Sequence, residues 1–405
     1  MPLLPAPATT DRNVLAIILA VAGLLRLIAA LVIPDQSSLL PDAEVYRDSA
    51  AQLLRQWHMT SHYQMPLYPL LIAIVGPGWP QIAADVALSV ISVWLVYALA
   101  QELFANRWAA ALAGAAAACY PPLIFFSVVG LSETLFIALV LAAFLQWYRS
   151  HFTSAAIFAV LAVLTRPVFD FAAPGLVLIF ALVVHRLSFL QALRRLAVYG
   201  LVYCALMAPW WLHNYQLYGS FVRLTLGAGI TLYAGNNPLN RTGGGNVGVD
   251  YDVSTFQSIA DPVERDRALR SAALAYIADH PQRFLELAAL KFIRIWRFWP
   301  VHEGYANAAT IMIAIASFVP VVLLALVGLF LKRYELRRLS PILLFGAGYT
   351  TIHMVLVGTI RYRLPLEPFL LIFAGVAVSS LIEAALSLRA RDRVAATASR
   401  DSTNC

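Results

Sequence analysis

The sequence predicts an all-α membrane protein, a polytopic transmembrane bundle of about ten helices. Of its 405 residues, 60% are hydrophobic and only 13% are charged, and the mean hydropathy is +0.73. A soluble domain has too little interior to bury so much apolar surface, whereas a bilayer accepts it without one compact core. The basic residues also fall in short clusters between apolar runs, as in membrane proteins. We therefore predict a single membrane-embedded domain over residues 1–405.

Apolar windows approaching the length that a helix needs to cross the hydrocarbon define the predicted spans. The first is interpreted as a span because it is longer than a typical signal-peptide core and lacks a clear cleavage site. The windows lie at 14–33, 82–104, 107–126, 131–149, 153–165, 171–186, 195–212, 306–331, 339–358 and 364–387.

Basic residues set the predicted orientation. With the N-terminus inside, every short cytoplasmic loop carries at least one basic residue, as the positive-inside rule requires. Residues 388–405 then form a polar cytoplasmic tail, and 34–81, 213–305 and a short segment around Arg361 face outward. We expect a multi-pass protein of the bacterial inner (plasma) membrane with its active site on the periplasmic face. The inside basic residues are Arg107, Arg149, Arg186, Arg194, Arg195, Lys332, Arg333, Arg337, Arg338, Arg389, Arg391, Arg393 and Arg400.

Both long outer stretches contain predicted amphipathic helices. Residues Pro41 to His58 could lie along the interface with one apolar side. The larger stretch opens with a Gly- and Asn-rich run, Gly235 to Gly248, which lacks the Lys-Ser/Thr ending of a phosphate loop and is predicted to be flexible. Helices are predicted from about Asp261 to His280 and from Pro281 to Trp299.

Composition argues against several classes of ligand. The net charge of +7 could suggest nucleic acid, but the basic residues lie where membrane topology places them. Cys119 and Cys204 fall inside apolar runs and Cys405 is the last residue, so the cysteines offer neither a disulfide framework nor a metal set. The histidines share no metal-ligand spacing. We expect no nucleic acid, no metal and no cofactor.

Asp42 and Glu44 follow the first predicted span. A carboxylate held at a membrane surface and partly desolvated can act as a general base. The alternative is that these acids only begin a helix, with Asp42 as its N-cap or first-turn charge.

Glu133 and Arg166 lie at the outer ends of two predicted spans. Ionisable groups within a membrane helix are costly, so they are candidates for function. The alternative is a salt bridge between the two that fixes helix packing.

Arg361 and Arg363 precede the last span at its outer end, and Lys291, Arg294 and Arg297 approach the same side. Clustered guanidinium groups at the depth of the lipid headgroups can bind a phosphate through paired hydrogen bonds. They could equally anchor anionic lipid headgroups. Arginine at an outer interface departs from the positive-inside rule. This departure favours the interpretation that these residues bind a ligand.

An ordered series of short motifs resembles the polyprenyl-phosphate-sugar-dependent glycosyltransferases of the C-type superfamily. The likeness is strongest to the family 39 group, which includes protein O-mannosyltransferases and aminoarabinose transferases. The motifs are Pro41-Asp42-Ala43-Glu44, Met65-Pro66-Leu67-Tyr68-Pro69-Leu70, Ser132-Glu133-Thr134-Leu135-Phe136, Leu164-Thr165-Arg166-Pro167, Pro209-Trp210-Trp211, Asn214-Tyr215, Gly235-Asn236-Asn237-Pro238, His280-Pro281 with Lys291 and Trp299, and Arg361-Tyr362-Arg363-Leu364-Pro365.

This resemblance implies an inverting transfer of one sugar from a polyprenyl-monophosphate donor to an acceptor glycan, lipid or protein outside the cytoplasm. In such enzymes the acid of the first outer loop is the catalytic base, which corresponds to Asp42. Basic residues near the last loops hold the lipid phosphate, and Arg361 is the best match to them. The predicted substrate-binding residues are Glu44, Glu133, Arg166, Lys291, Arg361 and Arg363.

Two alternative functions, from other classes of protein, remain. A transporter or flippase of a lipid-linked saccharide would use the same arginines for binding alone, but it should carry polar groups within its spans and often related halves. A non-catalytic assembly factor would not need Asp42.

Overall fold

The computed structural model describes the backbone of residues 9–33, 40–56, 58–59, 61–300 and 307–402, and the side chains of these segments between residues 12 and 387. Every regular element in these ranges is helical; Val247 and Tyr251 form one isolated bridge. The helices are α1 Thr9–Val32, α2 Pro41–Gln56, α3 Leu67–Val75, α4 Trp79–Phe104, α5 Arg107–Cys119, α6 Pro121–Phe126, α7 Glu133–Tyr148, α8 Phe152–Thr165, α9 Ala173–Ile179, α10 Phe189–Tyr218, α11 Ala228–Gly235, α12 Pro262–Asp279, α13 Pro281–Trp296, α14 Ala308–Leu331, α15 Leu336–Val355 and α16 Glu367–Ser402. Short helical turns are η1 Pro167–Phe171, η2 Phe180–Val184, η3 Ser254–Phe256, η4 Arg333–Glu335 and η5 Ile360–Leu366.

The predicted class, an all-α membrane protein, is confirmed for the described residues. Five of their helices are long and apolar enough to cross a bilayer, and three apolar helices are shorter. The count of about ten spans stays a prediction. The long segments are Arg12–Val32, Trp79–Phe104, Phe189–Tyr218, Ala308–Leu331 and Ile360–Ser387; the shorter ones are Glu133–Tyr148, Phe152–Thr165 and Ala173–Val184.

The window predicted at 107–126 is not one continuous helix. It divides at Tyr120 into α5 and α6, because Pro121 and Pro122 begin the second helix. Proline lacks the backbone N–H that would continue the ladder of α5, but it is tolerated in the first turn of a new helix. The chain therefore bends here before it reaches Glu133, the first residue of α7.

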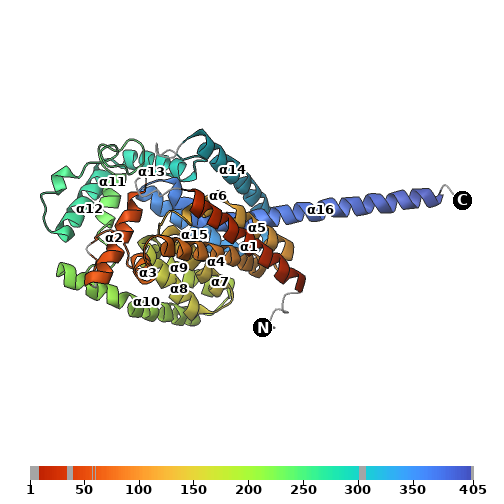
Figure 1. Ribbon diagram of the computed structural model, residues 1–405, viewed down its shortest axis with the longest axis horizontal. Coiled ribbons are helices and arrows are strands. Elements are labelled where there is room, and N and C mark those ends of the chain that lie inside the picture. Colours follow the sequence, from red (N-terminus) through yellow and green to blue (C-terminus); the bar gives the residue numbers. More distant parts are fainter. Residues whose placement is uncertain (1–8, 34–39, 57, 60, 301–306, 403–405) are drawn as a thin grey trace.

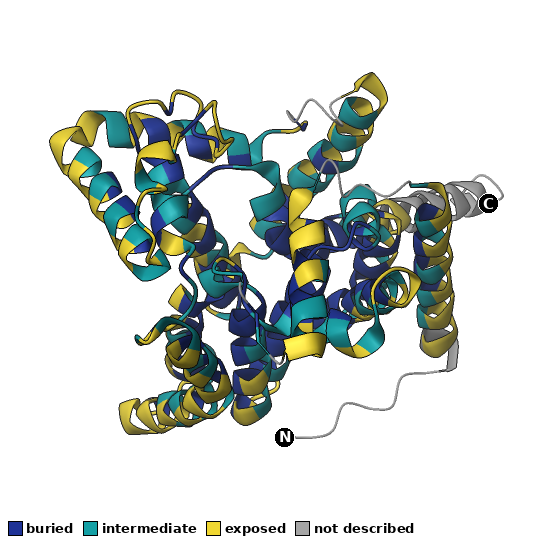
Figure 2. Cartoon of the chain, turned by 60° about the vertical axis from the view of Figure 1, so that its left-hand side comes forward, coloured by how far each residue is buried: buried dark blue, intermediate teal, exposed yellow. Residues whose placement is uncertain are grey.

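Helix α7 is buried along almost its whole length, and buried residues gather in the interior of the bundle (Figure 2). Around Phe144, ring centroids lie 5.8 Å away for Trp147, 5.7 Å for Phe180, 5.5 Å for Phe345 and 4.9 Å for Phe369. Such aromatic pairs contribute beyond the area they bury. They hold α7 against η2, α15 and α16, so the polar start of α7 has a fixed place relative to the last helices.

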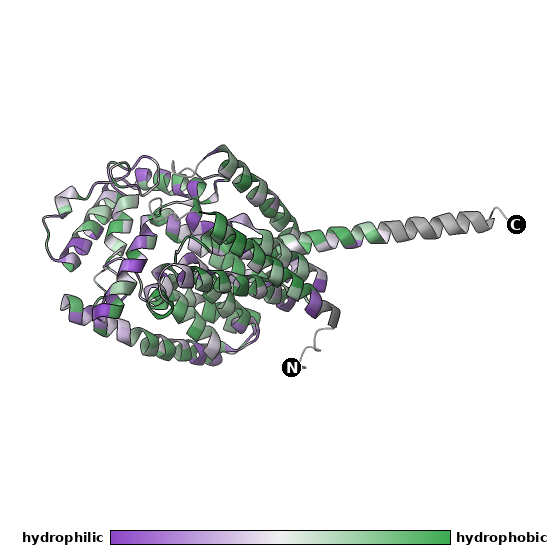
Figure 3. Cartoon of the chain, viewed as in Figure 1, coloured by the Kyte–Doolittle hydropathy of each residue, from purple (hydrophilic) through white to green (hydrophobic). Residues whose placement is uncertain are grey.

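Polar segments gather at one end of the molecule. Helices α2, α11 and α12 lie at the end opposite the two chain termini (Figure 1). Hydrophilic residues concentrate at this end, whereas the middle of the bundle is mostly hydrophobic (Figure 3). The helices predicted from Asp261 and Pro281 are present as α12 and α13. The predicted tail is helical as far as Ser402, and residues 403–405 lie outside the described chain.

The Gly- and Asn-rich run, predicted to be a flexible loop, follows α11 as an irregular segment whose asparagine side chains are hydrogen-bonded to nearby backbone groups. Asn237 donates to the carbonyls of Tyr233 (2.8 Å) and Asp250 (3.0 Å). Asn240 donates to Ala234 (2.7 Å) and accepts from the backbone N–H of Gly243 (2.8 Å). Both asparagine side chains are buried, and their amides satisfy backbone groups that the irregular chain would otherwise leave unpaired. We call residues 235–250 the asparagine loop.

Candidate active site

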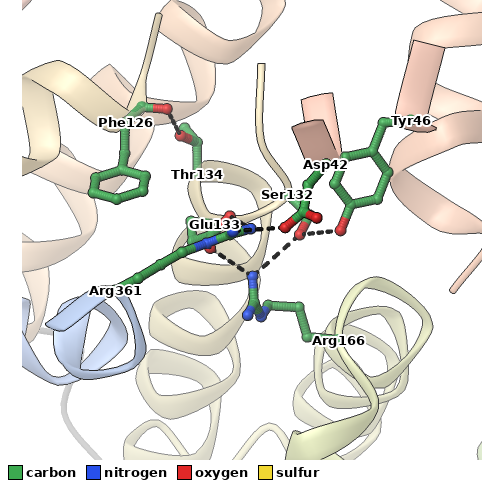
Figure 4. A network of polar contacts seen from close by, with 8 residues as sticks. All are labelled: Asp42, Tyr46, Phe126, Ser132, Glu133, Thr134, Arg166 and Arg361. Carbon is green, nitrogen blue, oxygen red and sulfur yellow. Dashed lines mark hydrogen bonds and ion pairs between the residues drawn. The ribbon is translucent and has the colours of Figure 1, made fainter. Parts of the chain in front are cut away.

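Four charged residues from distant parts of the sequence meet near the polar end of the bundle (Figure 4). Asp42 lies in the first turn of α2, Glu133 begins α7, Arg166 caps the end of α8, and Arg361 lies in η5. Each is at or next to a helix end, where side chains can reach one another across the bundle. The structure thus brings together four of the seven residues that the sequence singled out.

Arg361 connects the two carboxylates. Its Nε and Nη2 both donate to Glu133, the latter to Oε2 at 3.2 Å, in a two-point contact. Its Nη1 donates to Asp42 Oδ2 at 2.6 Å. A planar guanidinium can serve two acids at once, because its N–H groups point in fixed, different directions.

Glu133 also pairs with Arg166. Nη1 of Arg166 lies 2.7 Å from Glu133 Oε1 and donates to the hydroxyl of Ser132 at 3.3 Å. The hydroxyls of Ser132 and Tyr46 are 2.9 Å apart. The salt bridge considered from the sequence is therefore present, and it coexists with the contact to Arg361.

Exposure divides the cluster into an inner and an outer part. The Glu133 side chain is 1% exposed and that of Asp42 is 54% exposed. The two acids and two arginines sum to no net charge, so the buried groups are compensated. Asp42 is the one member of the four that is largely open to solvent, so water can solvate its carboxylate if it leaves Arg361.

Arg363 does not share the environment of Arg361. Its side chain is 4% exposed, and its Nε donates to Glu367 at 2.7 Å. The guanidinium carbon lies 3.5 Å from the ring centroid of Phe318, and Nη1 donates to the carbonyls of Ile295 (3.3 Å) and Arg297. These contacts occupy the guanidinium inside the protein, so its predicted phosphate contact would require them to be exchanged.

Glu44 lies on α2, two residues beyond Asp42, and is exposed. Successive helix positions point in different directions, about 100° apart, so two neighbours two residues apart do not share a face. The structure therefore joins Asp42 to the cluster and leaves Glu44 on another side of the helix.

Lys291 is fully buried in α13. Its ammonium donates to Asn236 Oδ1 at 3.0 Å and to the carbonyl of Val355 at 3.2 Å. Both partners are uncharged. The lysine thus joins α13 to the asparagine loop and to the end of α15, whose next residues lead to Arg361.

Burial lowers the pKa of Lys291 from 10.5 to about 7. The unfolded chain keeps this proton up to about pH 10.5, so between those two pH values it binds more protons than the folded chain. The contribution of Lys291 therefore favours the folded state increasingly as pH rises through that window. We expect the melting temperature of the wild type to rise from pH 7 to pH 9.5 relative to that of Lys291→Met, measured in the same detergent. A constant difference between the two proteins would contradict this prediction.

Sequence reasoning missed three participants in this region: Tyr46, Ser132 and Asn236. Tyr46 lies four residues after Asp42 on a predicted helix, a spacing that places both on one face, so this signal was present. Ser132 directly precedes Glu133. Asn236 belongs to the motif Gly235-Asn236-Asn237-Pro238, but nothing in the sequence pattern indicated which side chain it contacts. Among the described residues, no group of three or more His, Cys, Asp or Glu side chains is arranged to hold a metal ion.

The fold is similar to that of solved oligosaccharyltransferase and ArnT structures, in agreement with the motif resemblance. The sequence itself matches no protein-family model and no curated protein, so the likeness is one of structure. Oligosaccharyltransferase from Archaeoglobus fulgidus in the apo form is 14% identical, with a TM-score of 0.56 over 95% of this chain and 52% of its own.

Two similar structures contain lipid phosphates. One is the same archaeal enzyme, AglB, in complex with an inhibitory peptide and a dolichol-phosphate (TM-score 0.54, 14% identity, 95% of this chain and 52% of that one). The other is ArnT from Cupriavidus metallidurans bound to undecaprenyl phosphate (TM-score 0.52, 16% identity, 92% of this chain and 61% of that one). The present chain spans about half the length of the archaeal protein.

Proposed function

We propose that this protein transfers a sugar from a polyprenyl-monophosphate donor to an acceptor hydroxyl at the extracytoplasmic face of the bacterial inner membrane. The observation that carries the proposal is the shared guanidinium of Arg361. It is fixed on one side by buried Glu133 and meets exposed Asp42 on the other. The carboxylate that we propose as the base therefore lies beside the cation that we propose as the phosphate ligand. The fold shared with lipid-phosphate-bound transferases supports the same conclusion.

The proposed reaction is a direct displacement. The acceptor oxygen forms a bond to the anomeric carbon while the bond from that carbon to the phosphate oxygen breaks. The electron pair leaves with the lipid phosphate, and the proton of the acceptor hydroxyl goes to Asp42. Attack opposite the leaving group inverts the anomeric centre. Arg361 stabilises the charge that develops on the departing phosphate, an electrostatic effect that is often the largest in such sites.

We assign the seven predicted site residues different roles according to their positions. Arg361 is the proposed phosphate ligand, Glu133 holds it in place, and Arg166 in turn pairs with Glu133. The donor phosphate would approach the N–H groups that now face Asp42, because the opposite edge is occupied by buried Glu133. Glu44, Lys291 and Arg363 would act on substrate only at a greater distance or after rearrangement.

The test is transfer of radiolabelled sugar from a polyprenyl-phosphate donor in membranes containing the purified protein. We expect Arg361→Gln to raise the donor KM about ten- to a hundredfold, since hydrogen bonds to charged groups contribute about 1.5–3 kcal/mol. Arg333→Gln is the matched control, because Arg333 is exposed in η4 and outside the cluster.

Movement of the lipid-linked sugar across vesicles by the wild type, without transfer to any acceptor, would favour a transporter. An unchanged donor KM in Arg361→Gln would contradict the proposed phosphate site.

A further inference from the structure

The chain must leave α15 at a defined point for Arg361 to reach the cluster. Helix α15 ends at Val355, and Leu356 follows with φ −84° and ψ −101°, outside the helical region. Five residues after Leu356 comes Arg361 in η5. A shift in where α15 ends would therefore move the guanidinium away from Glu133 and Asp42.

Two side chains hold the last carbonyl of α15. Lys291 Nζ lies 3.2 Å from the Val355 oxygen, and Asn236 Nδ2 lies 2.8 Å from it. Lys291 also donates to Asn236 Oδ1 at 3.0 Å, which orients that amide. Carbonyls at a helix C-terminus have no partner within the helix and carry partial negative charge, so donors and cations there are favourable.

Glycines allow two segments to approach Lys291 closely. A side chain at Gly243 would place its Cβ 3.1 Å from Lys291 Cγ, and one at Gly358 would lie 2.6 Å from the Lys291 carbonyl oxygen. The Gly358 N–H donates to the Gly243 carbonyl at 3.1 Å, and Arg294 Nε donates to the Gly358 carbonyl at 3.1 Å. The asparagine loop, α13 and the segment leading to Arg361 thus form one tight junction around Lys291.

Stability alone does not account for a lysine here. The side chain is 0% exposed, and the described residues place no carboxylate on it. Burying an ionisable group without a counter-ion is costly, and an apolar residue of similar volume is often as stable or more so. Compared with a methionine at this position, the lysine side chain adds directional hydrogen bonds to Asn236 and Val355.

We infer that Lys291 is a positioning residue: by holding the end of α15 and the asparagine loop together, it sets the place of Arg361 at the active site. This inference rests on the proposed function only for its effect on donor binding. Charged groups at the junction include Arg294, on the same helix, and Asp250, in the asparagine loop, which both approach Gly244. Lys291 acts on the substrate through Arg361 and does not itself touch the phosphate.

The test compares Lys291→Met with the wild type, with Lys332→Met as the matched control. Lys332 is the other lysine of the chain and pairs with Glu335 in the turn between α14 and α15. We expect amide hydrogen exchange in residues 356–362 to become about tenfold faster or more in Lys291→Met, with no general loss of protection. The donor KM should rise about tenfold while kcat changes less, since displaced binding groups weaken substrate positioning. Lys291→Gln, which keeps an N–H donor, should restore part of both effects.

The outcomes separate this inference from the proposed function. Faster exchange at 356–362 in a protein whose wild type transfers no sugar would support the positioning role and reject the proposed function. Unchanged exchange and donor KM in Lys291→Met would overturn the inference. A fall in melting temperature with faster exchange throughout the protein, and no rescue by Gln, would also overturn it, since Lys291 would then serve stability alone.

Discussion

Asp42→Asn is expected to lower kcat for sugar transfer by a factor of about 10² to 10⁴, the usual contribution of a general base. The same variant should bind polyprenyl phosphate at least as tightly as the wild type. Asp42 now occupies the side of Arg361 that a phosphate would need, and an amide competes less well than a carboxylate for a guanidinium. Transfer kinetics and direct binding of polyprenyl phosphate measure the two effects separately.

The matched control is Asp48→Asn, because Asp48 is an exposed carboxylate on the same helix. It should leave both transfer and lipid binding close to those of the wild type. Transfer at the wild-type rate in Asp42→Asn would remove Asp42 as the base. Weaker binding of polyprenyl phosphate in that variant would show that Asp42 assists the phosphate and does not compete with it.

Glu133→Gln should produce the largest loss of stability. It leaves Arg166 and Arg361 close together without the buried carboxylate that compensates both. Removing one partner of a buried ion pair typically costs about 3–5 kcal/mol, because a charge remains buried and unpaired. We expect a clear fall in melting temperature and in the yield of folded protein after extraction from the membrane.

Glu286→Gln provides the comparison. Glu286 also pairs with an arginine, at 2.8 Å, but its side chain is 51% exposed. An exposed pair contributes only about 0–1 kcal/mol. Equal melting temperatures for the two glutamine variants would mean that Glu133 is not the counter-ion on which the cluster depends.

The sequence predicted the parts of the fold that depend on local pattern. Hydrophobic runs located most of the helices, and charge pattern located α12 and α13. The contact between Glu133 and Arg166 was also foreseeable, since the two lie at the same end of consecutive apolar segments. The Lys291 environment could have been found too: Leu287, Lys291 and Ile295 recur every four residues and all three are buried, so the lysine falls on the apolar side of α13.

Other features of the site depend on tertiary packing, which a local sequence pattern does not predict. Arg361 and Arg363 are two residues apart in a 3₁₀ turn, where successive residues rotate by about 120°, so their side chains point in different directions. Which of them faces the cluster is decided by the packing of η5; the family resemblance favoured Arg361, but the local pattern does not distinguish the two arginines. The asparagine loop looked flexible because of its glycines, while the buried amides of Asn237 and Asn240 that order it make contacts set by the folded chain.

The order in which the four charged groups are synthesised has a consequence for insertion into the membrane. Glu133 and Arg166 belong to consecutive helices, α7 and α8, and can neutralise each other as soon as that hairpin forms. Arg361 is made almost 200 residues later, immediately before the final helix. The early pair thus lets a costly acid enter the bilayer with its charge already balanced. The proposed active site gains Arg361 only when the last part of the chain is made, so a ribosome-bound chain that ends before Arg361 has only the pair of Glu133 and Arg166.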